Sequence, residues 1–66
     1  MRILLLEDQE SLRQSTRKGL EEMGFAVDAV EDGDVALERA LAVPFDALVL
    51  DITNGVKIGD RLVNPL

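Results

Sequence analysis

The chain has 66 residues, with 7 Lys and Arg against 13 Asp and Glu, and a formal net charge of −6. The absence of cysteine and histidine excludes disulfide scaffolds, thiolate or imidazole zinc sites, and catalysis by a cysteine nucleophile or a histidine base. The acidic charge and the lack of Trp and Tyr argue against nucleic acid and acidic membrane surfaces as partners of this chain. At 47% hydrophobic residues, the chain is too apolar to be disordered.

The apolar runs are short. None approaches the roughly 18 residues of a membrane-spanning helix. The N-terminal segment reaches Glu7 and Asp8 too soon for the apolar region of a secretory signal. We therefore expect one cytoplasmic domain that does not cross a membrane.

The first two predicted elements are a strand and a helix. Residues 3–6 form an uninterrupted apolar run, which is typical of a strand buried on both faces in a parallel sheet. Residues 9–23 have the period of an amphipathic helix, and we expect its apolar stripe to enter the core. That stripe comprises Leu12, Thr16, Leu20 and Met23.

Two glycines and a basic face add detail to this helix. Gly19 is expected to permit close contact with a sheet, and Gly24 to be a left-handed cap residue. Arg13, Arg17 and Lys18 are expected to form a solvated face, because a run of charge on a helix usually does.

A second strand and a second helix follow. Residues 25–30 alternate in a way that suits a strand near a sheet edge. Asp34 is the expected N-cap of a helix that continues to about residue 42, and Pro44 ends it. The run 47–50 predicts another buried strand.

The order of these elements is β-α-β-α-β, with short connections. Parallel strands joined by right-handed crossovers predict an α/β fold with sheet order 2-1-3. The remaining residues differ, since 56–58 and 61–63 flank Gly59-Asp60 as a β-hairpin would. We therefore divide the chain into residues 1–53 and an atypical tail, 54–66.

Three acids follow the two apolar strands. Glu7 and Asp8 come directly after the first strand, and Asp51 closes the third. In a 2-1-3 sheet the carboxyl ends of these strands are neighbours, so the acids should converge at the crevice where open α/β sheets bind ligands. Hard oxygen ligands without nitrogen or sulfur suit Mg²⁺, and Asp51 becomes a candidate nucleophile toward phosphorus. The alternative is that the acids are solvated turn residues.

Residues 1–53 resemble a response-regulator receiver domain of the OmpR/PhoB-like subfamily. The resemblance rests on residues 1–8, on 24–28 with the Asp32-Gly33 turn, and on the strand 47–51. It implies a flavodoxin-like (CheY-like) fold, truncated to about its first half, without enzymatic activity of its own. It further implies phosphorylation of Asp51 by a sensor histidine kinase, with the first helix facing that kinase.

The resemblance also implies a Mg²⁺ site. Asp8 would bind the ion directly, Glu7 through water, and the backbone carbonyl of Thr53 would be a further ligand beside Asp51. The chain lacks the Ser/Thr after the fourth strand and the Lys after the fifth strand that the family uses, so phosphotransfer is expected to be impaired. Residues 56–65 resemble the first β-hairpin of the subfamily's winged-helix effector domain. The alternative is that they are an arbitrary hairpin or a frame-shifted end.

Two other functions compete with this one. Asp51-Ile52-Thr53 superficially resembles the nucleophile loop of haloacid-dehalogenase-type phosphatases, although Thr53 stands where a second Asp is usual. Alternatively, the chain is an inactive half-fold that self-associates. The strand 47–50 would then present an apolar, unpaired edge, for which a homodimer is the simplest solution.

Overall fold

The computed structural model describes residues 1–51, 56–58 and 61–63. The chain alternates strands and helices up to residue 51, as the sequence predicts. The elements are β1 (Arg2–Glu7), α1 (Glu10–Glu22), β2 (Ala26–Val30), α2 (Gly33–Ala42), β3 (Ala47–Asp51), β4 (Val56–Ile58) and β5 (Arg61–Val63).

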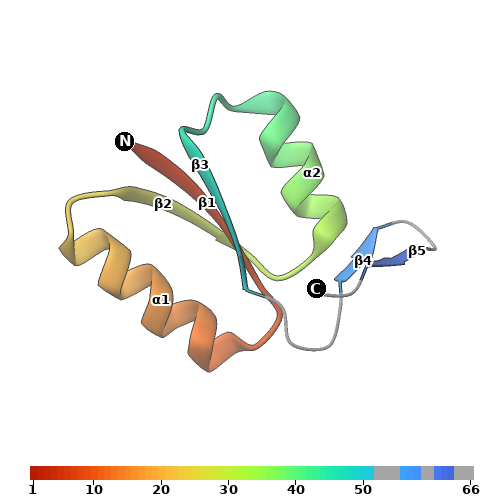
Figure 1. The fold of residues 1–66 in the computed structure, drawn as a ribbon, viewed down its shortest axis with the longest axis horizontal. Helices are drawn as coiled ribbons and strands as arrows, with labels where there is room; N and C mark the ends of the chain where they lie inside the picture. The colour runs from red at the N-terminus through yellow and green to blue at the C-terminus, as the bar shows by residue number, and fades with distance from the viewer. Residues whose placement is uncertain (52–55, 59–60, 64–66) are drawn as a thin grey trace.

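A three-stranded parallel sheet organises the fold (Figure 1). Its order is β2-β1-β3, which confirms the predicted topology of a CheY-like α/β unit. Two hydrogen bonds between Asp46 and Arg2 hold the start of β3 beside the start of β1. The N–H of Asp46 donates to the carbonyl of Arg2 over 2.8 Å, and the Asp46 carboxylate accepts the N–H of Arg2 over 2.7 Å.

Strand β1 forms the centre of the core. Its residues from Ile3 to Glu7 are all buried, and Leu5 is 0% exposed. Leu4 and Leu6 cluster with Val30, Ala36 and Phe45, on the side of the sheet that faces α2. Because side chains alternate along a strand, Ile3 and Leu5 lie on the opposite face, toward α1.

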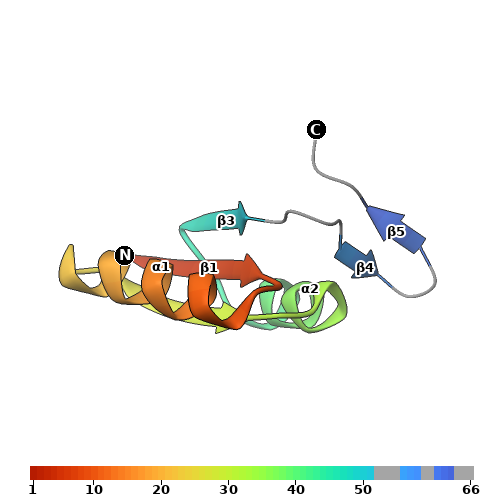
Figure 2. The ribbon, with the colours of Figure 1, turned by 90° about the horizontal axis from the view of Figure 1, so that it is seen from below.

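The two helices lie on opposite faces of the sheet, beside β1 and β2 (Figure 2). Helix α1 contributes no fully buried residue. Leu12 is 40% exposed and Met23 is 71% exposed, so the prediction that the whole apolar stripe enters the core is wrong. The reason is that α1 packs on β2 and β1 and does not reach β3, which leaves the ends of its stripe uncovered.

The helix termini confirm one prediction and correct another. Gly24 follows α1 with φ 95°, in the left-handed region where glycine is favoured. Asp32, not Asp34, is the N-cap of α2, since its carboxylate accepts the N–H of Asp34 over 2.7 Å. Gly19 is exposed, and a Cβ there would meet nothing within 4 Å, so the expected close approach to the sheet is absent.

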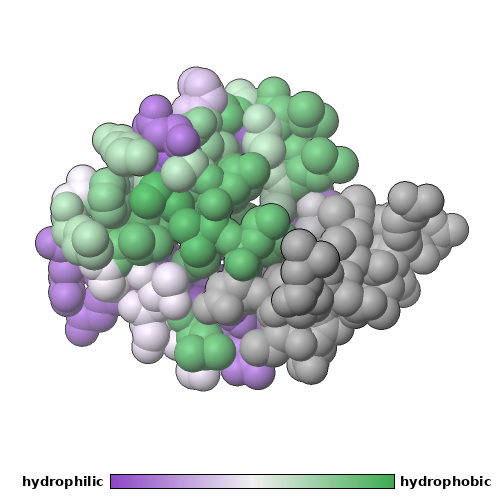
Figure 3. Space-filling view, in the orientation of Figure 1, coloured by the Kyte–Doolittle hydropathy of each residue, from purple (hydrophilic) through white to green (hydrophobic). Residues whose placement is uncertain are grey.

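Strand β3 lies at the outer edge of the sheet, beyond the cover of either helix (Figure 2). Leu48 is 56% exposed and Leu50 is 62% exposed, so β3 is not the buried strand that its composition predicts. In the view onto this edge, hydrophobic side chains gather over β3 and continue over α2 (Figure 3). A strand of buried composition is therefore left open to solvent.

The tail contains an antiparallel pair, as predicted. Strand β4 pairs with β5, with Val56 opposite Val63, and β4 lies beside α2. The predicted turn at Gly59-Asp60 lies outside the described residues.

Candidate functional site

The acid-bearing ends of β1 and β3 are neighbours in the sheet. Glu7 and Asp51 are partners in the parallel register, each the last residue of its strand. Asp8 follows Glu7 at the start of the connection to α1. The backbone therefore brings all three predicted acids to one edge of the sheet, where open α/β sheets bind ligands.

Glu7 is a buried acid within this site. Its side chain is 0% exposed, and Oε1 accepts the backbone N–H of Gln9 over 3.0 Å. This bond connects the end of β1 to the residue that precedes α1. Gln9 has extended backbone angles at the N-cap position and makes no side-chain cap. The Glu7 carboxylate consequently organises the connection where the chain turns from strand to helix.

Asp8 has an oxygen without a hydrogen-bond partner among the described residues. Its Oδ1 atom is buried from solvent, although the residue as a whole is only partly buried. A buried carboxylate oxygen normally has a partner, because desolvation without one is costly. A cation supplies such a partner, so this atom fits the predicted Mg²⁺ site.

The other predicted ligands cannot be placed as side chains. The side chain of Asp51 and the whole of Thr53 lie outside the described residues. Among the side chains that are described, no group of three acids converges as metal ligands. The structure thus brings Glu7, Asp8 and the backbone of Asp51 together, and leaves the metal set itself as a prediction.

Arg13 is the site residue that sequence reasoning missed. The side chain is only 13% exposed, which corrects its assignment to a solvated face. Its Nη1 donates to the backbone carbonyl of Glu7 over 3.2 Å and lies 3.7 Å from Oε2 of Glu31. The sequence signal is weak, since Arg17 on the same helix makes an ordinary exposed ion pair with Glu21 at 3.5 Å.

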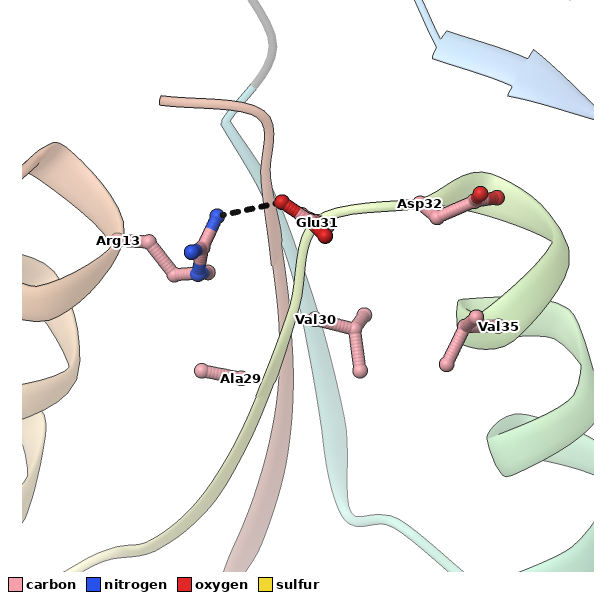
Figure 4. A pocket seen from close by; sticks show the side chains of 6 residues that line it. All are labelled: Arg13, Ala29, Val30, Glu31, Asp32 and Val35. Carbon is pink, nitrogen blue, oxygen red and sulfur yellow. Dashed lines mark ion pairs between the residues drawn. The ribbon is translucent and has the colours of Figure 1, made fainter. Parts of the chain in front are cut away.

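A groove opens beside Arg13, between α1, β2 and the start of α2 (Figure 4). It has a volume of about 330 Å³ and combines apolar walls with charged ends. The Arg13 side chain points from α1 across the groove toward Glu31. The remaining lining residues are Ala29, Val30, Asp32 and Val35.

The chain is similar to several bacterial transcriptional regulators. It is 43% identical over 53 residues to the transcriptional regulatory protein QseB of Haemophilus influenzae, which covers 80% of this chain and 24% of that protein. It is 44% identical over 52 residues to the transcriptional activator protein IrlR of Burkholderia pseudomallei, covering 79% and 23% respectively. With the transcriptional regulatory protein CutR of Streptomyces coelicolor it shares 43% identity over 51 residues, covering 77% and 24%.

These similarities concern part of each relative. The chain spans about a quarter of the length of the curated relatives it matches. No family model matches the chain, and no solved structure matches it. Neither of the described helices is long and apolar enough to cross a bilayer.

The relatives are two-component response regulators of the OmpR/PhoB-like type. The similarity to QseB extends over 53 of the 66 residues, and the described fold contains the parallel β2-β1-β3 sheet in which Glu7 and Asp51 are partners. By this similarity and this fold, the chain is homologous to response regulators and has the fold of the β1-to-β3 part of a receiver domain.

Proposed function

We propose that the edge formed by the ends of β1 and β3 is a Mg²⁺-dependent phosphoacceptor site of a two-component phosphorelay, with Asp51 as the phosphoacceptor. The observation that carries the proposal is the register of Glu7 with Asp51, beside the buried Oδ1 of Asp8. Homology to response regulators supports it, since those proteins act with sensor kinases.

Each residue has a defined role in the proposal. Asp8 would bind Mg²⁺ directly, Glu7 through a water molecule, and the carbonyl of Thr53 would complete the ligand set beside Asp51. The bound ion would neutralise charge that develops on the phosphoryl oxygens. A carboxylate oxygen of Asp51 would attack phosphorus, the bond to the donor would break, and an acyl phosphate would form on Asp51.

The reaction should be slow. Phosphoryl transfer depends on charge stabilisation around the transferred oxygens. The sequence keeps the three acids but has neither the Ser/Thr nor the Lys that complete the family's site. The phosphoryl donor would be a sensor histidine kinase in the cytoplasm. The chain would accept the phosphoryl group and would not turn over a substrate of its own.

Labelling with acetyl phosphate, followed by intact mass, tests the proposal. We expect slow, partial, Mg²⁺-dependent addition of one phosphoryl group that disappears in Asp51→Asn. Glu22→Gln is the matched control, because Glu22 is exposed at the last position of α1, near the opposite edge of the sheet from the acids.

Four outcomes would contradict parts of the proposal. Labelling that persists in Asp51→Asn would exclude Asp51 as the acceptor, and no labelling after long incubation would exclude a phosphoacceptor site. Complete labelling within minutes would show that transfer is not impaired. Turnover of a phosphate ester would favour the alternative of an aspartyl-nucleophile phosphatase.

A second proposal is that the chain is a self-associating module. The observation that favours it is the exposed edge strand β3, with Leu48 and Leu50 more than half exposed. Unpaired strand edges with apolar side chains template pairing with another chain. Sedimentation velocity at micromolar concentration should give a mass of twice the 7.2 kDa chain, and a monomer throughout would contradict this proposal.

A further inference from the structure

The free edge of β3 presents a defined set of backbone groups. The Asp46 N–H donates to the carbonyl of Arg2 in β1. Along a strand the N–H and C=O groups of successive residues point to opposite edges, so those of Leu48 and Leu50 also face β1. The groups of Ala47, Val49 and Asp51 therefore face the free edge. In the described part of the chain, no strand pairs with that edge.

The central part of this edge, residues 47–50, carries no charge or proline that would block pairing. Natural edge strands usually carry charges, prolines or bulges that block a second chain. Residues 47–50 of β3 are all apolar, and Leu48 and Leu50 stand open to solvent over the same face as the α2 core. The hydrophobic surface over β3 in Figure 3 is the outcome of this pattern.

We infer that β3 pairs with β3 of a second copy, antiparallel, about a two-fold axis at Val49. This inference rests on the self-association proposed above and specifies its geometry. Val49 would exchange both backbone hydrogen bonds with Val49 of the second copy, because its N–H and C=O already face outward. Ala47 would do the same with Asp51 of the second copy, at each end of the strand.

The register follows from the strand itself. Centring the axis on Val49 uses the whole of the five-residue strand Ala47–Asp51, whereas a shift in either direction leaves outward groups unpaired. Leu48 then lies opposite Leu50 of the second copy in a pair without hydrogen bonds, where side chains approach most closely. The two Asp51 residues sit at opposite ends of the ladder, which limits repulsion between the chains.

The helices leave room for a second copy. Both α1 and α2 pack beside β1 and β2, and neither covers β3 (Figure 2). A strand can therefore approach in the plane of the sheet without displacing them. The product is one continuous sheet with the order β2-β1-β3-β3-β1-β2. The free β3 edge of each copy is paired with that of the other, so the assembly is closed.

Disulfide trapping tests the register, since the chain has no cysteine of its own. A ¹⁵N-labelled Leu48→Cys chain is mixed with an unlabelled Leu50→Cys chain and oxidised gently. Opposed residues would lie about 4.5 Å apart between Cα atoms, within disulfide range, whereas Leu48 and Leu48 of the second copy would lie about 7–8 Å apart. Both leucines are exposed, so the substitutions should preserve the fold.

We expect the mixed disulfide to exceed each same-site disulfide by on the order of tenfold. Leu41→Cys, on α2 and 81% exposed, is the control and should form no rapid disulfide. A sedimenting dimer that gives equal mixed and same-site products would overturn the register alone. A monomer at all concentrations would overturn self-association as well, so the two failures are distinguishable.

Ionic strength provides a second readout. Each chain carries a net charge of −6, and two acidic chains repel one another through water. Pairing through the uncharged residues 47–50 should therefore tighten as salt is raised, because screening removes the repulsion. Dissociation by salt would contradict an apolar β3 interface and would indicate one built on ion pairs.

Discussion

The guanidinium of Arg13 donates to the backbone carbonyl of Glu7 over 3.2 Å, and this bond fastens α1 to the end of β1 where the acids gather. The same Nη1 atom lies 3.7 Å from the Glu31 carboxylate at the end of β2. One side chain from the first helix thus links the carboxyl ends of two neighbouring strands. Arg13 therefore helps to position the strand ends that carry the acids, although it is not itself one of the candidate ligands.

Arg13→Ala should lower the free energy of unfolding by about 1–3 kcal/mol, because it removes a charged donor from a largely buried carbonyl. Urea titration followed by far-UV circular dichroism measures this, since the chain has no Trp or Tyr for fluorescence. Arg17→Ala is the control. Its ion pair with Glu21 is about half exposed and should be worth about 0.5 kcal/mol or less. Equal losses in the two variants would contradict the linking role of Arg13.

Alanine at the two glycines around α1 should act in opposite directions. Gly24→Ala should destabilise the fold by about 1–2 kcal/mol, because φ 95° is strained for a residue with a Cβ. Gly19→Ala should stabilise it by about 0.5–1 kcal/mol, since the added methyl meets no neighbour and alanine favours a helix. Thermal denaturation at one fixed protein concentration compares them. A stability change of the same sign in both variants would contradict the left-handed cap at Gly24.

Asp32→Ala should cost about 1 kcal/mol, because its carboxylate caps α2 by accepting the N–H of Asp34. Amide hydrogen exchange should show faster exchange of the first α2 amides in this variant. Glu38→Ala, an exposed change in the same helix, should leave them unaltered. Unchanged exchange after Asp32→Ala would mean that another group caps the helix.

Leu5→Ala should remove about 2–5 kcal/mol, since Leu5 is 0% exposed at the centre of the sheet. A small domain has about 5–15 kcal/mol in total, so much of this variant should be unfolded at 25 °C. Leu41→Ala, at an 81% exposed position, should change the stability by no more than about 0.5 kcal/mol. Circular dichroism in urea compares the pair, and a stable Leu5→Ala would contradict a core centred on β1.

The elements and their order could be predicted because their signals are local. Gly24 after one helix and Pro44 after the other end them by backbone preference alone. The handedness of parallel connections then leaves the 2-1-3 order as the natural choice. The convergence of Glu7 and Asp51 follows from that order, without any information on side chains.

Burial and side-chain direction could not be predicted in the same way. Leu48 and Leu50 have the composition of a buried strand, but their exposure depends on what covers β3. Asp32 and Asp34 are equally good caps by residue type. The structure begins α2 at Gly33, and this start makes Asp32 the N-cap. Arg13 and Arg17 are one helical turn apart, yet only Arg13 faces the strand ends.

A Mg²⁺ titration followed by amide NMR shifts tests the central claim most directly, namely that the acids at the ends of β1 and β3 form one metal-dependent site. The account predicts saturable shifts of the amides at Asp8, Asp51 and Thr53, which Asp51→Asn or Asp8→Asn weakens by at least about tenfold in affinity. Glu22→Gln, an exposed change at the last position of α1, should leave them unchanged. Shifts that do not saturate, or that persist unaltered in Asp51→Asn, would contradict it.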